Sequence, residues 1–487
     1  MAQNLPYKSL IQLKRKSDLS LHIQISTRFI SLITNGTLLP KSPLPSTRVL
    51  ADLIGVNRNT VKLAYEELIS QGWADSVARK GVFVISSLPL LKKQIAPPPV
   101  VDYEDSFSWN NKFETLPFSP NFQTNMLTVD DGFPDVRLTP VDFLMREYRS
   151  ISKKFYGKSF LKYGSSKGSE RLRATLSKYV STTRGLQVNL DNILITKGSQ
   201  MGIYLAAHLL LSSSDYIAVG INNYGPADST FKLCGAQLLR IPIDDFGMDI
   251  DYLAKLLEHI KIKAVYIIPH HHFPTTVTMS VERRLKLLNL AKHYRFAIIE
   301  DDYDYDFHYS NSPYIPLASI DHNNNVIYIG SITKTFAPAL RIGFLIGPPK
   351  FVDNASELRQ LIDKQGDSLL EEAFASLIEN GDLERHFRKC LKIYKYRRDL
   401  FCQILKSDFN DVITYKVPEG GLAVWSCFDE KIDLLKLSQK VAKQGLRLGD
   451  GTFYKNEVFD VNGLRLGFAS LNEMEMQEAL NILKKNV

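Results

Sequence analysis

A chain of 487 residues with 44% hydrophobic and 23% charged residues has the composition of a globular protein with two or more domains, so whole-chain disorder is excluded. The four cysteines form no Cys-x-x-Cys pair and are too few to staple a chain of this length, which excludes a disulfide scaffold. No apolar run reaches bilayer length and the first ten residues lack the layout of a signal peptide, so we expect a cytoplasmic protein.

The net charge of +8 is unevenly distributed along the chain. Up to Leu88 there are 11 Lys and Arg residues against five Asp and Glu, so six of the eight excess positive charges lie in the first fifth of the sequence. Basic surface concentrated in a small segment favours a polyanion as partner, because each Lys or Arg set on a phosphate releases a condensed counterion. A solvated basic face is the alternative that charge alone leaves open.

Residues 1–86 show the patterns of three helices and a hairpin. Apolar residues at helical spacing predict a first helix over 21–33, and Ser46 or Thr47 can cap a short second helix that ends at Gly55. The third helix has inner-face positions at i, i+3, i+4 and i+7, which are Val61, Ala64, Tyr65 and Leu68. A hairpin over 73–85 with a basic tip completes the pattern of a winged helix-turn-helix.

The stretches Leu44-Pro45-Ser46-Thr47-Arg48, 54–61 and 64–68 closely resemble the DNA-binding domain of GntR-type regulators. The resemblance implies that the exposed face of the third helix enters the major groove of a double-stranded operator, while the hairpin tip enters the minor groove. By position, the residues that contact DNA would be Arg48, Asn57, Arg58, Thr60, Lys62, Arg79, Lys80 and Gly81. Most protein–DNA bonds go to phosphates, so only some of these would specify sequence. A helical trio used only for dimerisation is the alternative.

Residues 87–115 contain Pro97-Pro98-Pro99 and have no clear helical or strand period. We predict a linker of partly polyproline character, which separates the head, residues 1–86, from a body, residues 116–487. In the body, helical segments alternate with short apolar runs at 192–196, 216–219, 264–269, 297–301 and 326–330. Strands separated by helices predict an α/β fold with a mainly parallel sheet covered by helices on both faces.

Ligands bind beyond the carboxyl ends of the strands in such sheets, and polar residues stand there in this sequence. The first set is Gly198-Ser199-Gln200, where free helix amides and a hydroxyl form a cradle suited to a phosphate. A helix cap without a ligand is the alternative.

The second set is the acidic run 300–306, in which a buried carboxylate can pair with a protonated pyridine nitrogen and a Tyr can donate to the ring's phenolic oxygen. Magnesium or calcium is the alternative ligand of this run.

The third set, 331–341, places Lys334 among hydroxyls and close to Arg341, which are the surroundings of a Schiff-base lysine. In isolation Lys334 could be an ordinary surface lysine, but the cradle and the acidic run precede it in the order that the fold requires. The fourth set is Arg465 in the apolar strand 463–468, where a guanidinium is most readily explained by capture of a ligand carboxylate. A buried structural ion pair is the alternative.

These four sets, together with Tyr224 and Phe273-Pro274-Thr275, occur in the order found in fold-type I aminotransferases. From about residue 118 onward the chain most resembles the aminotransferase-like body of the MocR subgroup of GntR regulators, in which such a head and body are fused. The resemblance implies a PLP-dependent transferase fold of type I with a smaller C-terminal α+β part. It also implies a homodimer that builds each site at the subunit interface.

The resemblance further implies pyridoxal 5'-phosphate (PLP) as the cofactor, with a role for each residue by position. Lys334 would form the Schiff base and serve as the catalytic residue of an enzyme, Asp301 would bind the pyridine nitrogen, and Tyr303 would bind the ring oxygen. Tyr224 would stack on the ring, and Arg465 would hold the ligand carboxylate. The phosphate ligands would be Ser199, Gln200, Ser331 and Arg341.

The sequence departs from the subgroup at several positions. Pro226 stands where the GABA-responsive member has a second carboxylate-binding arginine, which argues against GABA as the ligand. His270-His271-His272 replaces Ser-His-Gln, Thr276 replaces Gly, and Ala423 stands where His is frequent. Consecutive residues in an extended segment point different ways, so we do not expect the three histidines to bind one ion, and we predict no metal site.

Together these features predict a DNA-binding, PLP-dependent transcription regulator. An amine or amino-acid ligand would displace Lys334 from the cofactor, be clamped by Arg465, and change how paired heads bind their half-sites. The ligand class stays open between an amino acid, a polyamine-like amine and PLP itself. A catalytically active aminotransferase with an accessory DNA-binding head is the main alternative, and a DNA-binding protein with an empty relic body is another.

Overall fold

The computed structural model describes residues 5–15, 17, 19–78, 80–86, 126–309, 314–320 and 324–487. The chain divides into two compact units, Met1–Asn110 and Asn111–Val487. The predicted linker, 87–115, lies outside the described residues, as does Arg79 of the predicted hairpin tip. Among the helices of the described ranges, none is both long and apolar enough to cross a membrane.

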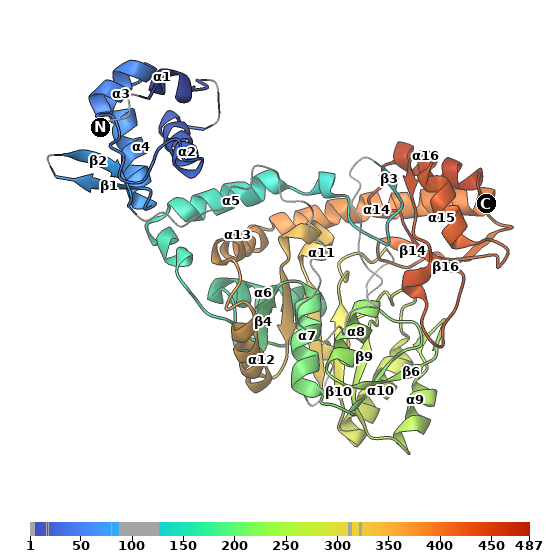
Figure 1. The fold of residues 1–487 in the computed structure, drawn as a ribbon. Helices are drawn as coiled ribbons and strands as arrows, with labels where there is room; N and C mark the ends of the chain where they lie inside the picture. Colours follow the sequence, from blue (N-terminus) through green and yellow to red (C-terminus); the bar gives the residue numbers. More distant parts are fainter. Residues whose placement is uncertain are drawn as a thin grey trace. The chain divides into compact units, whose positions relative to one another are not determined.

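The head contains the predicted helices and hairpin (Figure 1). Its elements are α1 (Tyr7–Leu10), α2 (Leu21–Thr34), α3 (Thr47–Ile54), α4 (Arg58–Ser70), β1 (Ala74–Val77) and β2 (Gly81–Val84). The Ser46 side chain caps α3 by accepting from the Val49 amide, and Gly55 ends this helix in the left-handed region at φ 67°. The short turn between α3 and α4 therefore follows directly from the cap residues of the sequence.

A single apolar cluster holds the head together. Phe29 of α2 is fully buried, and its ring lies 6.1 Å from that of Tyr7 and 5.7 Å from that of Tyr65. The predicted inner face of α4 is buried at all four positions, which confirms the periodicity that defined this helix. The opposite face of α4 is left at the surface and carries the polar side chains.

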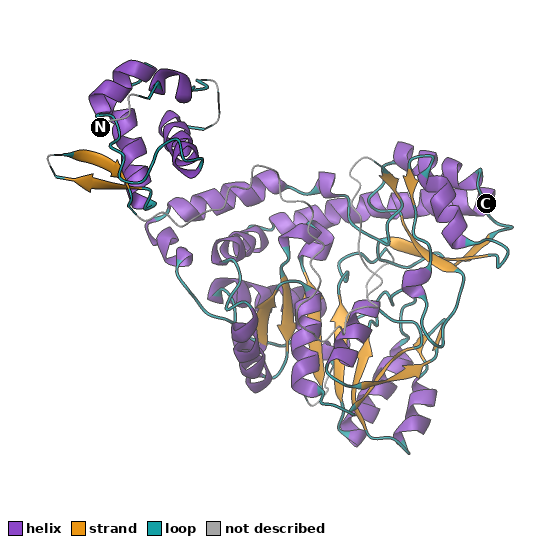
Figure 2. Ribbon diagram, viewed as in Figure 1, coloured by secondary structure: helices purple, strands orange, loops and turns teal. Residues whose placement is uncertain are grey.

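The body is built on a seven-stranded mixed sheet (Figure 2). Its strands, in spatial order, are β4 (Ile193–Thr196), β12 (Gly343–Ile346), β11 (Val326–Ser331), β10 (Ala297–Asp302), β9 (Ile262–Ile267), β5 (Tyr216–Gly220) and β6 (Gln237–Ile241). Four pairings are parallel, whereas β12 runs antiparallel to both of its neighbours. The five predicted strands are confirmed, and β6 and β12 are additions that the sequence pattern did not reveal.

Helices cover both faces of the sheet, as predicted. In β9, Ala264 and Tyr266 pack into one apolar cluster, and Val265 and Ile267 pack into a second one on the opposite face. The first cluster includes residues of α7 (Ser199–Leu210) and α8 (Gly225–Leu233). The second includes residues of α9 (Ile250–Leu257) and α10 (Val281–Tyr294).

The remaining elements form the flank and the C-terminal part of the body. The helices are α5 (Val141–Lys153), α6 (Glu170–Arg184), α11 (Thr333–Phe336), α12 (Pro349–Ile362), α13 (Ser368–Glu379), α14 (Asp382–Asp408), α15 (Leu434–Ala442) and α16 (Glu473–Lys484). A small antiparallel sheet contains β13 (Ile413–Tyr415), β14 (Ala423–Phe428) and β16 (Gly463–Gly467). Short pairs join β3 (Leu127–Thr128) to β15 (Leu446–Arg447), and β7 (Ile243–Asp244) to β8 (Gly247–Met248).

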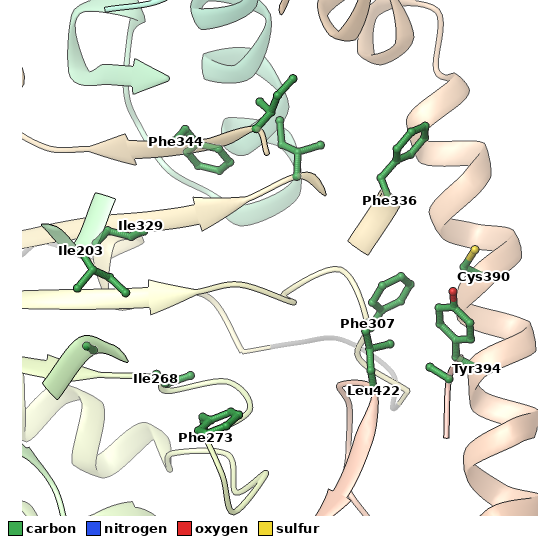
Figure 3. Packing of buried hydrophobic residues seen from close by; sticks show 14 of the residues in the cluster. Ile203, Ile268, Phe273, Phe307, Ile329, Phe336, Phe344, Cys390, Tyr394 and Leu422 are labelled. Atoms are coloured by element: carbon green, nitrogen blue, oxygen red, sulfur yellow. The ribbon is translucent and has the colours of Figure 1, made fainter. Parts of the chain in front are cut away.

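One continuous core connects the large sheet to this C-terminal part. Figure 3 shows side chains of this cluster, from Ile329 of β11, through Phe307 after β10, to Tyr394 of α14 and Leu422 before β14. The rings of Phe307 and Tyr394 lie 5.1 Å apart at an interplanar angle of 70°. Apolar packing therefore fixes the small sheet relative to the strand ends of the large sheet.

We predict that Gly330→Ala destabilises the body by about 1–3 kcal/mol, because a Cβ at this position in β11 would collide with the Phe344 ring of β12. The change would lower the urea midpoint measured by circular dichroism. The matched control is Gly449→Ala, where the added Cβ would make an ordinary 3.5 Å contact with Leu464. Equal midpoints for the two variants would contradict this packing.

Candidate functional site

Three of the predicted polar sets follow strands that end at the same edge of the large sheet. Thr196 at the end of β4 and Ser331 at the end of β11 both pair with Gly343 of the intervening β12, so they lie level. Asp302 at the end of β10 pairs with Gly330 of β11. The strand register thus brings the cradle at 198–200, the acidic run and the Lys334 segment together.

Asp301 is a buried carboxylate at this edge, with an exposed fraction of 2%. Its Oδ2 accepts a 2.7 Å hydrogen bond from the Tyr266 hydroxyl, while its Oδ1 is buried without a hydrogen-bond partner among the described residues. Burial raises the pKa of Asp301 to about 7. One fixed oxygen and one unused oxygen fit a protonated ring nitrogen, which would supply the missing hydrogen bond and stabilise the charged carboxylate.

Lys334 lies in α11, three residues after the end of β11 at Ser331, and is half-buried. Its Nζ is 4.2 Å from the ring centroid of Phe133 and 5.8 Å from that of Tyr303. Burial lowers the pKa of Lys334, opposed most strongly by the charge of Asp131. A lowered pKa increases the fraction of free amine, which is the form that attacks a carbonyl carbon.

The aromatic residues assigned to the ring are also at this edge. Tyr224 precedes α8, and its ring meets that of Phe273 edge-on at a centroid distance of 5.4 Å. Burial raises the pKa of Tyr224 to about 12. The Tyr303 hydroxyl donates to the backbone carbonyl of His271 at 3.2 Å. Burial raises the pKa of this phenol, so it remains a protonated donor at neutral pH.

The residues predicted to hold a phosphate surround the N-terminus of α7. Gly198, at φ 77°, is the N-cap of this helix and has no side chain to accept from the first-turn amides. Amides of this kind suit an anion such as a phosphate. Arg341 donates to the Lys197 carbonyl at 2.9 Å, and a Cβ at Gly198 would collide with its guanidinium. Ser331 accepts from the Lys334 amide at 3.2 Å.

Gln200 is oriented differently from a direct phosphate ligand. Its side-chain nitrogen donates to Thr230 Oγ1 at 3.1 Å and to the Pro226 carbonyl at 3.4 Å. The side chain thereby ties α7 to α8. For Gln200, the backbone amide in the first turn of α7 is the group that suits an anion.

Arg465 comes from β16 of the small sheet, opposite Trp425 of β14. It is 4% exposed, and its Nε and Nη1 donate to the carbonyls of Asp131 and Pro274 at 2.9 and 3.1 Å. No ion pair between Arg465 and a carboxylate occurs within the described ranges. A buried guanidinium whose hydrogen bonds go to carbonyls and to the Tyr303 hydroxyl, with no carboxylate among the described residues, is suited to an incoming carboxylate.

The three consecutive histidines have separate partners. His270 Nδ1 lies 3.3 Å from Asp302 Oδ1, His271 Nδ1 lies 2.8 Å from Asp304 Oδ1, and His272 Nδ1 lies 2.8 Å from Thr275 Oγ1. In the part of the chain that the structure describes, no cluster of three or more side chains could hold a metal ion. The acidic run instead accepts from protein groups: the Leu317 amide bonds Glu300, the Tyr328 hydroxyl bonds Asp302, and Arg184 pairs with Asp306.

Sequence reasoning missed two contributors to the site. The first is Tyr266, whose hydroxyl donates to Asp301. Tyr266 was missed because the contact depends on the pairing of β9 with β10, which cannot be read from the sequence alone. The segment 130–133 reaches Arg465 and Lys334 through Asp131 and Phe133. Its acidic pair before a glycine was visible in the sequence but was not connected to any strand end.

In the head, the residues predicted to contact DNA lie on α3, α4 and the hairpin. Arg58 Nε donates to Thr47 Oγ1 at 3.3 Å, and Lys62 pairs with Glu66 at 3.5 Å. Asn57 caps α4, since its Oδ1 accepts from the Asn59 amide at 2.8 Å. The exposed members of the set are Arg48, Asn57, Arg58, Lys62, Lys80 and Gly81, and Thr60 is half-buried.

Comparison with known proteins agrees with this two-part organisation. The model of aminotransferase class I and II matches residues 138–483, and that of bacterial regulatory proteins of the gntR family matches residues 22–84. The probable rhizopine catabolism regulatory protein MocR of Rhizobium meliloti is 24% identical, with 98% of this chain and 95% of that protein covered. The chain belongs to the aminotransferase class I and II family and to the MocR subgroup of GntR-type regulators.

Further relatives of this MocR-type chain include both regulators and enzymes. An uncharacterized HTH-type transcriptional regulator, YisV of Bacillus subtilis, is 28% identical over 95% of this chain and 96% of its own length. The crystal structure of Pyrococcus horikoshii kynurenine aminotransferase in complex with PMP has 29% identity and a TM-score of 0.69, covering 75% of this chain and 91% of that one. The protein is thus a transcription regulator with an aminotransferase-like body, and the fold of that body implies PLP.

The buried carboxylate of Asp301 makes the stability of the cofactor-free protein depend on pH. Its folded-state pKa of about 7 lies above the ordinary value of 3.8, so the folded state retains a proton that the unfolded state loses as pH rises from 4 to 7. The contribution of Asp301 to the free energy of unfolding is therefore fully present at low pH and is lost as pH rises through 7. Asp301→Asn, which stays neutral, should gain at least about 1 kcal/mol relative to wild type between pH 5 and pH 8.

This comparison requires urea titrations of the cofactor-free proteins at both pH values. The control is Asp411→Asn, an exposed acid between α14 and β13, which should show no such pH-dependent gain. A relative stability of Asp301→Asn that does not change with pH would contradict a raised pKa at this position.

Proposed function

We propose that this MocR-type protein is a cytoplasmic regulator that senses an amine or amino acid, or PLP itself, at a Lys334 Schiff base. The observation that carries the proposal is the convergence of three groups near one sheet edge. These are the half-buried amine of Lys334, and two groups without a partner among the described residues: Asp301 Oδ1, which lacks a hydrogen bond, and the Arg465 guanidinium, which lacks a carboxylate. When bound, PLP supplies an aldehyde that condenses with primary amines and a conjugated ring that absorbs light.

The residues of this chain would have the following tasks. Asp301 holds a proton-bearing ring nitrogen, Tyr303 donates to the ring oxygen, and Tyr224 stacks on the ring. Arg465 orients a ligand by its carboxylate. The phosphate is held at the start of α7 by Ser199 and the Gln200 amide, together with Ser331 and Arg341.

We further propose a division into a DNA-binding domain at 1–86, a linker at 87–115 and an effector domain at 116–487, with the protein acting as a homodimer. Apolar side chains left exposed on and around α5 support a subunit interface. They are Val136, Val141, Phe143, Met145, Leu161 and Tyr163, with exposed fractions between 42% and 83%. To be useful, ligand binding must distinguish two dimer states by about 1–3 kcal/mol.

The covalent assignment is tested with Lys334→Ala. The purified variant, incubated with PLP, should lack the absorption band of a protein-bound imine, and borohydride should fix no cofactor to the chain. Lys350→Ala, an exposed lysine at the start of α12, should behave like wild type. Borohydride labelling of the Lys334→Ala protein would refute the assignment.

The DNA interface is tested with Arg58→Ala and Lys80→Ala. Loss of one phosphate contact should weaken binding to the DNA upstream of the protein's own coding sequence and reduce the slope of log K against log salt by about 0.9. Lys436→Ala in α15, whose side chain is 77% exposed, removes the same charge outside the head and should leave both quantities unchanged. Fluorescence anisotropy at several salt concentrations measures both.

A working aminotransferase with an accessory DNA-binding head is the second candidate. It is favoured by the presence of lysine, aspartate and arginine in one site, because the amine of Lys334 could also move a proton between the ligand's α-carbon and the cofactor. Measuring keto-acid formation over many turnovers beside sequence-specific DNA binding separates the two. High turnover without specific DNA binding would favour the enzyme, and the reverse would favour the regulator.

A further inference from the structure

We propose that the ligand of this site is an amino acid with a cationic side chain, such as a terminal amine, and that Asp131 binds this second positive group. The inference rests on the proposed function, because it assumes that the ligand's α-amine and α-carboxylate are directed to Lys334 and Arg465. It adds the chemical class of the ligand, which neither the fold nor the family decides.

The segment 131–133 lies between the two anchoring groups of the site. The Asp131 carbonyl accepts the 2.9 Å hydrogen bond from Arg465 Nε, and a Cβ at Gly132 would be only 3.2 Å from Arg465 Nη2. Two residues from Asp131, the ring of Phe133 is 4.2 Å from Lys334 Nζ. The segment that carries Asp131 therefore lies beside both groups that would hold the ligand.

The two adjacent acids of this segment have different environments. Asp130 is fully engaged, since Oδ1 accepts from the Gly132 and Phe133 amides at 2.8 Å and Oδ2 accepts from the Ser470 hydroxyl at 2.6 Å. The half-buried Asp131 carboxylate has no hydrogen bond or ion pair with any residue that the structure describes. Asp130 thus shapes the turn, and Asp131 is available to a ligand.

The charges around Asp131 favour a cation. Its carboxylate exerts the largest opposing charge effect on the pKa of Lys334, and it also acts on Tyr224, Tyr454 and Arg465. When the Lys334 amine is bound to PLP as the proposed function requires, Asp131 no longer faces a free ammonium group. An acidic ligand side chain would then be repelled by Asp131, whereas a basic one would be attracted to it.

Aromatic rings beside the two anchors suit the rest of such a ligand. Phe273 lies under the guanidinium of Arg465, with Cζ 4.7 Å from the ring centroid, and its own ring is 5.9 Å from that of Tyr454. The rings of Phe453 and Tyr454 lie 5.4 Å apart. Such faces accommodate an alkyl chain and attract a cation.

The test compares L-lysine with L-norleucine, which has the same chain length without the terminal amine. Each is titrated into the purified full-length holo-protein while the absorption band of the bound cofactor is followed. Wild type should respond to lysine at a concentration at least about tenfold lower than to norleucine, as expected for a charged hydrogen bond in a partly buried site. Asp131→Asn should reduce this preference, taken as the ratio of the two responses, to less than about threefold.

Asp411→Asn is the matched control and should keep the wild-type preference for lysine. Equal responses of wild type to lysine and norleucine, or a preference for L-glutamate, would overturn the inference alone. So would an unchanged preference in Asp131→Asn. If neither amino acid shifts the band and borohydride labels no Lys334, the proposed function fails as well. The wild-type comparison does not depend on the folding of any variant.

Discussion

The burial of the Asp301 carboxylate at the end of a strand is the constraint on which the candidate site depends. Removing such a charge from water without a counter-charge costs several kcal/mol, and the hydrogen bond from Tyr266 offsets only part of this cost. The neighbouring strands fix the geometry, since β9 supplies Tyr266 and β11 leads to Lys334. In the proposed function, a cationic ring nitrogen would supply the hydrogen bond that Asp301 Oδ1 lacks among the described residues, which would link cofactor binding to the stability of this edge.

Much of this site could be predicted because its residues follow strand ends, where sequence order translates into position. Lys334 and Asp301 fall at the ends of strongly apolar runs, and parallel pairing of β10 and β11 brings them together. Strand β12 was missed because its four residues begin two positions after Arg341 and look like a continuation of that motif. Strand β6 was missed because its polar residues weaken the apolar run.

The contributions of Tyr266 and Asp131 could not be predicted for a different reason. Both depend on contacts between segments far apart in the sequence, as in the bond from Arg465 to the Asp131 carbonyl, 334 positions away. Sequence periodicity places a residue on a face of an element but does not say which element faces it. Residues that reach the candidate site through such distant contacts are therefore visible only in the folded structure, whereas those at strand ends can be found from local motifs.

The cap of α4 has a consequence for how the head reads DNA. The side-chain oxygen of Asn57 accepts from the Asn59 amide at 2.8 Å, so the cap fixes the orientation of this side chain. An amide oxygen has a second lone pair, and the side-chain nitrogen carries two donor hydrogens. The two-bond pairing that asparagine makes with the edge of adenine would therefore share this oxygen between the helix and the base. Any base contact by Asn57 is thus made in the orientation that the cap imposes.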